Sequence, residues 1–143
     1  MSTLFVETDD EAAAALRFDG DASDLLALLS FGVAEPFGSQ HPLTQLVRRL
    51  KREHGLDVGP LLTFYDRDVD DAVDAANLEA AWQEAASLRD CVGAVRAALA
   101  GDAAATALLA GFEAIPDLLR QLEQMSAQAA VDKARIRVSF SLD

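Results

Sequence analysis

The chain has 143 residues, a formal net charge of -12 and a sequence pI of about 4.4. A chain of this length is the size of one domain and can bury a core without disulfides or a structural metal. Because phosphate groups repel so acidic a chain, we expect no nucleic-acid partner and no binding to anionic membranes. A protein partner with a basic surface, divalent cations and a salt-rich environment all remain compatible with this charge.

The single cysteine and the hydropathy of the chain bear on the cellular compartment that we expect. Cys91 is the only cysteine, so an internal disulfide and a multi-cysteine zinc site are excluded, and we expect a packed, inert thiol. The first residues lack a basic segment followed by an apolar run, and no stretch of about 18 residues is apolar throughout. We therefore expect a cytoplasmic protein.

The N-terminal part predicts one strand and two helices. Residues 3–7 fit a short strand, and a capping-box pattern after them predicts an alanine-rich helix over about 9–17. Residues 22–31 are apolar on most sides, which predicts a central helix with Gly32 as its left-handed end.

The next helix lies between Pro42 and Gly55, since proline suits a first helical turn and glycine suits a helix end. Its last turns carry four of the chain's twelve bases, where cations oppose the helix dipole. These four, here called the basic segment, are Arg48, Arg49, Lys51 and Arg52. Residues 61–65 after it fit either a connector laid on the core or a short extended piece.

A long helix is expected over about 69–100. The apolar residues of this stretch recur in steps of three and four, as in one seam of a helix. They are Leu78, Ala81, Ala85, Leu88, Val92, Val95 and Leu99. The seam fits a core-facing helix or, with less support because it holds two alanines, a coiled-coil interface.

The last third predicts two helical pieces and a strand. Asp102 suits the N-cap of the first piece, and Pro116 indicates either a kink or the start of a new helix that runs to about Ala130. Apolar and polar residues then alternate over 135–142, as in a half-buried strand. This strand needs a partner in 3–7, in 61–65 or in a second copy of the chain.

Together these elements predict a mainly α fold, with α+β at the margin. We expect one domain over residues 1–143 that forms a bundle of about five helices. A small sheet would use the C-terminal strand and the N-terminal strand.

Five aspartates before the long helix form the strongest candidate site. They are Asp66, Asp68, Asp70, Asp71 and Asp74, and residues 66–74 are here called the acidic segment. Carboxylates in a first helical turn cap amides and meet the positive end of the dipole. Five acids exceed what capping requires, so the acidic segment also fits a docking surface for a basic partner.

A magnesium site is the other interpretation of the acidic segment. Asp70, Asp71 and Asp74 have the spacing DDxxD, and Asp70 and Asp74 would project from one helix face toward a shared Mg²⁺. Such a site needs a second acidic motif on a facing helix, and we find none with matching spacing. We therefore expect no cofactor, with Mg²⁺ held by Asp70 and Asp74 as the alternative.

Two further features bear on partners. Trp82 lies beside the apolar seam, as a core anchor or as an anchor at an interface. The basic segment fits a contact with the acidic segment of the same chain or of a second copy. A homodimer is therefore expected.

The sequence thus favours a non-enzymatic acidic interaction domain, such as an adaptor, an inhibitor or immunity-like protein, or a complex subunit. Its partner-binding residues would be those of the acidic segment together with Trp82. The alternatives are a Mg²⁺-dependent phosphohydrolase-type enzyme centred on Asp70, Asp71 and Asp74, and a salt-adapted domain whose acids serve only solubility. No catalytic residue is assigned, because His41 and His54 lie near opposite ends of one predicted helix and neither belongs to a motif.

Overall fold

The computed structural model describes residues 2–10, 13 and 15–142. Over these residues helices predominate beside one small four-stranded sheet, in agreement with the expected helix-rich fold. In chain order the elements are β1 (Ser2–Thr8), α1 (Ser23–Val33), the 3₁₀ helix η1 (Glu35–Phe37), α2 (Pro42–Arg52), β2 (Phe64–Asp66), α3 (Ala72–Ala80), β3 (Gln83–Glu84), α4 (Ala85–Ala100), α5 (Ala103–Ala107), α6 (Ile115–Val131) and β4 (Arg135–Leu142).

The C-terminal strand β4 is the centre of the sheet. On one side it pairs antiparallel with β1, and on the other it pairs parallel with β2 and antiparallel with β3. The strand predicted from the alternation over 135–142 is therefore confirmed. The two partner segments suggested within the chain, 3–7 and 61–65, both contribute residues to strands that pair with it. The structure resolves 61–65 as a connector that ends in the strand β2.

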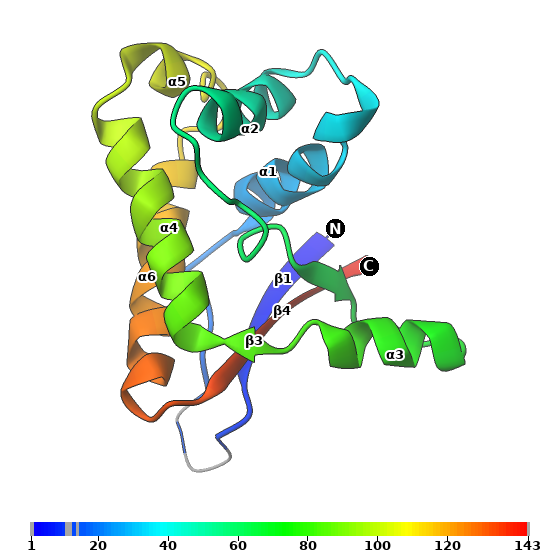
Figure 1. Ribbon diagram of the computed structural model, residues 1–143. Coiled ribbons are helices and arrows are strands. Elements are labelled where there is room, and N and C mark those ends of the chain that lie inside the picture. Colours follow the sequence, from blue (N-terminus) through cyan, green and yellow to red (C-terminus); the bar gives the residue numbers. More distant parts are fainter. Residues whose placement is uncertain (1, 11–12, 14, 143) are drawn as a thin grey trace.

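The sheet buries one face. The even-numbered residues Leu4 and Val6 of β1 and Ile136 and Val138 of β4 join the core, against which α1, α4 and α6 pack (Figure 1). Residues that pair in register lie on the same face, so the odd-numbered residues of these strands share the opposite face. That face carries polar and aromatic side chains and remains partly exposed.

The expected helix over 69–100 is wrong as a continuous element. α3 ends at Ala80, residues 83–84 pair with β4, and the Ala85 amide donates to the Ala134 carbonyl at 3.2 Å. The seam is buried from Ala85 to Leu99 on α4, whereas α3 has no buried residue. Pairing of residues 83–84 with β4 thus divides the expected helix into α3 and α4. The described residues contain six α-helices, against about five expected.

Two smaller expectations also need correction. Gly32 does not end its helix but lies within α1, where an added Cβ would lie 2.7 Å from Leu62 Cδ2 and would displace that side chain. The helix expected over 9–17 falls in part on residues 11–12 and 14, outside the described residues, and its described residues are not helical.

Several local predictions are confirmed. α2 begins at Pro42, and Gly55, with φ of 62°, lies just beyond its end. Asp102 caps α5, and Pro116 lies in the first turn of α6, so a new helix starts there rather than a kinked one continuing. None of the described helices combines the length and apolar character needed to cross a bilayer.

The broken helix makes a testable distinction between two leucines of the predicted seam. Leu88→Ala removes a fully buried side chain and should lower the free energy of unfolding by about 2–5 kcal/mol. Leu78→Ala removes a half-buried side chain of α3 and should cost about 1 kcal/mol. Urea unfolding measures both, and equal losses would place Leu78 in the core beside Leu88.

Candidate docking surface

The acidic segment connects β2 to α3, and two of its aspartates build the helix start. The Asp74 amide donates to Asp71 Oδ1 at 2.8 Å, and the Asp70 amide donates to Asp74 Oδ2 at 3.2 Å. This reciprocal exchange resembles a capping box and satisfies amides at the helix start that have no helical partner. The expectation that these acids cap a helix start thus holds for Asp71 and Asp74, but the helix begins at Ala72 and not at about 69, so Asp70 lies before it.

The other three aspartates contribute less to the local structure. Asp66 Oδ1 accepts from the Asp68 amide at 2.9 Å, and Asp68 Oδ2 accepts from the Ser141 hydroxyl at 3.2 Å. Among the described residues, no arginine, lysine or histidine nitrogen lies within 4.0 Å of any of the five carboxylates. The acidic segment therefore presents a negative charge that no ion pair of the described chain compensates.

The helix behind these acids is largely exposed, with Asp74 and Leu78 only half-buried. α3 extends away from the other helices at the end of the sheet near β2 and β3 (Figure 1), and none of its nine residues is buried. Val73 of α3 is 67% exposed, and Val69 just before it is 46% exposed. The result is a projecting element that combines exposed apolar side chains with uncompensated carboxylates.

Trp82 lies at the other end of α3. Its half-buried ring is covered by the Arg137 guanidinium, 4.4 Å from the ring centroid, and Arg137 in turn pairs with Glu7 at 3.0 Å. A nine-residue helix spans about 14 Å, so α3 separates the indole from the helix-start aspartates. The structure thus places the predicted partner-binding residues along one projecting element without bringing them together at a point.

Within the described residues, the structure brings no further metal ligand to Asp70 and Asp74. The described part of the chain contains no group of three or more histidine, cysteine, aspartate or glutamate side chains arranged to hold a metal ion. The Asp74 carboxylate already accepts the Asp70 amide. Magnesium binding by Asp70 and Asp74 stays a prediction.

The basic segment pairs with acids outside the acidic segment. Arg48 and Lys51 lie 4.0 Å and 3.5 Å from Oε1 of Glu35, whose side chain is buried. Arg49 Nε donates to Asp102 Oδ2 at 2.7 Å. Sequence reasoning missed both acids as partners, because each lies in another element and no local pattern relates them to α2.

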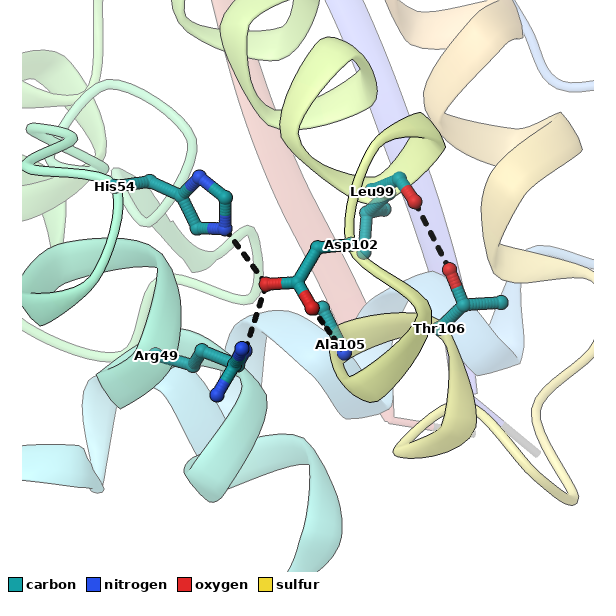
Figure 2. Close-up of polar contacts among 6 residues, drawn as sticks. All are labelled: Arg49, His54, Leu99, Asp102, Ala105 and Thr106. Atoms are coloured by element: carbon teal, nitrogen blue, oxygen red, sulfur yellow. Dashed lines mark hydrogen bonds and ion pairs between the residues drawn. The ribbon is translucent and has the colours of Figure 1, made fainter.

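Asp102 is the most highly bonded carboxylate of the described chain. Figure 2 shows it between Arg49 and His54, whose Nε2 lies 2.7 Å from the same Oδ2, while the Ala105 amide donates to Oδ1 at 3.1 Å. These hydrogen bonds, that from Arg49 first, hold the pKa of Asp102 well below its ordinary value of 3.8. The carboxylate ties the end of α2 to the turn between α4 and α5.

This cluster is a structural clamp rather than a catalytic triad. A triad requires a hydroxyl or thiol bonded to the histidine. In the described residues no such group hydrogen-bonds to His54, and the nearby Thr106 hydroxyl donates to the Leu99 carbonyl at 2.9 Å (Figure 2).

The remaining reactive side chains also have structural roles. His41 Nδ1 accepts from the Leu43 amide at the start of α2, and its ring stacks on Phe31 with centroids 3.6 Å apart. Cys91 is buried, and burial raises the pKa of its thiol, in agreement with the expected packed, inert cysteine.

Comparison with protein-family models, with curated proteins and with solved structures finds no match to this chain.

The Asp102 clamp predicts a specific dependence of stability on pH. Because folding lowers the pKa of this carboxyl, its contribution is present above about pH 4 and is lost as the pH falls below that value. Asp102→Asn should therefore be less stable than the wild type at pH 7, and the difference should shrink between about pH 4 and pH 2. Urea unfolding at several pH values measures it, and a difference that is constant across this range would contradict the clamp.

Proposed function

We propose that this protein is a non-enzymatic, cytoplasmic interaction domain that docks a basic surface of a protein partner through the acidic segment and α3. The observation that carries the proposal is that, within the described residues, this region has no intramolecular ion pair and its helix no buried side chain. Its five carboxylates form no ion pair there, and its helix has no buried residue.

The contrast with other acids of the chain supports this assignment. Glu35 and Asp102 are largely shielded from solvent and each is paired with cations of the basic segment. The acidic segment concentrates five carboxylates in nine residues beside the single cation Arg67, whose guanidinium lies over the Phe5 ring, so the carboxylates repel one another in the free protein. A partner that supplies arginine or lysine side chains relieves this repulsion and gains steering from the local field.

α3 and the residues between β2 and α3 supply the apolar part of the proposed surface, together with Tyr65 of β2. An isolated helix of nine residues is marginal in water, and α3 gains little from packing on the body of the protein. Val69, Val73 and the 37% exposed Tyr65 are available to contact a partner. Trp82 would act as an anchor only if the partner reaches the far end of α3.

The first test uses an oligo-arginine peptide as the probe. Asp66→Asn, Asp68→Asn and Asp70→Asn together remove three charges and leave the cap residues Asp71 and Asp74 in place. The matched control removes three charges from exposed aspartates elsewhere, by Asp19→Asn, Asp90→Asn and Asp132→Asn. Calorimetry at about 0.15 M salt, where the Debye length is about 8 Å, compares the two variants with the wild type.

The acidic-segment variant should bind the peptide roughly three- to hundredfold more weakly than the wild type, because each exposed ion pair contributes about 0.2–1 kcal/mol. The control variant should bind within about twofold of the wild type. Equal weakening in both variants would mean that the peptide responds only to net charge, and the proposed docking surface would be wrong.

Magnesium separates this proposal from the phosphohydrolase alternative. A ligand that binds only the native state raises the melting temperature. The proposal predicts that up to about 10 mM MgCl₂ changes the melting temperature of the wild type and of an Asp70→Asn, Asp74→Asn variant equally. A rise in the wild type that the double substitution removes would support the enzyme.

The salt-adapted alternative makes its own prediction. If the acids serve only solubility, stability should rise steeply with KCl concentration and the acidic-segment variant should bind the arginine peptide as the control variant does.

A further inference from the structure

A hollow of about 400 Å³ lies along the solvent-facing side of α2. Its lining is polar throughout and consists of Gln40, Gln45, Arg48, Arg49, Arg52 and Glu53. Those lining residues that belong to α2 recur in steps of three, one and three, which places them on one face of the helix, while Leu46 and Leu50 are buried on the other. The volume falls within the range of small-ligand sites, about 300–1,000 Å³.

Two of the three arginines are held from behind by carboxylates. Arg49 donates through Nε to Asp102 at 2.7 Å (Figure 2), and Arg48 Nε lies 4.0 Å from Glu35 Oε1. The side chains of Asp102 and Glu35 are only 9% and 8% exposed. The two guanidinium groups are thus positioned before any ligand arrives, which lowers the entropy that binding costs.

These contacts leave most of the guanidinium donors to solvent. A guanidinium carries five N–H donors. Within the described residues, neither Nη of Arg49 has a hydrogen-bond or salt-bridge partner, and Arg48 uses its Nη2 only for a 3.5 Å contact with the Ser39 carbonyl. Arg52 is exposed and has no such partner for any of its nitrogens there. The hollow therefore presents an excess of positively charged donors.

The charges near the hollow favour a small anion although the chain as a whole is acidic. Lys51 shares Glu35 with Arg48, and His54 shares Asp102 with Arg49, so Glu53 is the one carboxylate of the lining itself. At about 0.15 M salt the Debye length is about 8 Å, so a ligand in the hollow responds mainly to these nearby groups. The acidic segment lies beside α3, at the other end of the molecule from α2 (Figure 1).

An anion in the hollow would also relieve a repulsion within α2. Arg48 and Arg52 are four residues apart, and like charges at this spacing destabilise a helix. A ligand that accepts hydrogen bonds from both arginines converts this repulsion into attraction.

We propose that this hollow binds the phosphate group of a small molecule, either inorganic phosphate or a phosphate monoester. A guanidinium binds phosphate through two parallel hydrogen bonds, and a tetrahedral group presents oxygens in several directions, so two or three arginines can donate to it at once. A planar carboxylate offers two oxygens and one negative charge. This site goes beyond the proposed docking function and lies apart from the acidic segment, so either proposal can fail without the other.

Titration of the ¹⁵N-labelled full chain with inorganic phosphate at pH 7.5, at constant ionic strength set with NaCl, tests the proposal by NMR. We expect saturable shifts confined to residues near the hollow, at 40 and 45–53, with a millimolar dissociation constant. Arg52→Gln removes a cation without breaking a contact to any described residue and should weaken binding roughly two- to tenfold. Glu53→Gln removes the lining carboxylate and should tighten binding roughly two- to fivefold.

Lys133→Gln is the matched control, because it removes one exposed cation outside the lining of the hollow. Its dissociation constant should stay within about 1.5-fold of the wild type. Phenyl phosphate identifies the source of the phosphate group: tighter binding than that of inorganic phosphate indicates a monoester, and equal binding indicates phosphate itself. Shifts spread over the whole chain, equal weakening by Arg52→Gln and Lys133→Gln, or succinate binding as tightly as phosphate would each overturn the proposal.

Discussion

The structure depends on the pairing of β4 with three segments that lie far from it in the sequence. β1, β2 and β3 come from residues 2–8, 64–66 and 83–84, and all three hydrogen-bond to the last strand. Bringing such distant segments together costs loop-closure entropy, which the buried face of the sheet and its satisfied backbone groups offset. The same pairing decides which helices enter the core, because β3 interrupts the chain between α3 and α4. α4 packs on α6, whereas α3 remains outside.

Local patterns predicted the elements whose signals are contained within a few residues. The alternation of 135–142, the Pro42 helix start and the Asp102 cap are of this kind. The interruption at 81–84 could not be predicted in this way, because these residues contain no glycine or proline and continue the apolar period. Pairing with the distant Ile136 and Arg135 makes residues 83–84 a strand. In the candidate site, the cap role of Asp71 and Asp74 was visible from sequence, whereas the pairing of Arg49 with Asp102, 53 residues away, was not.

The basic and the acidic segments differ in how their charges are paired. Three of the four cations of the basic segment are paired internally, where Glu35 and Asp102 fix α2 against η1 and against the turn before α5. The acidic segment has no such internal cation within the described residues, and it precedes a helix that buries none of its residues. A projecting element of this kind contributes little to the core, and its carboxylates and exposed valines form the surface that we propose for docking.

Hydrogen–deuterium exchange at neutral pH tests the central claim, that pairing of β3 with β4 separates a solvated α3 from a packed α4. Amides exchange slowly when their opening requires disruption of the core and quickly when it does not. The account predicts fast exchange over 75–80, slow exchange over 89–100, and intermediate protection of the Ala85 amide that bonds to Ala134. Uniform slow exchange across 75–100 would contradict it, because that pattern belongs to one continuous buried helix.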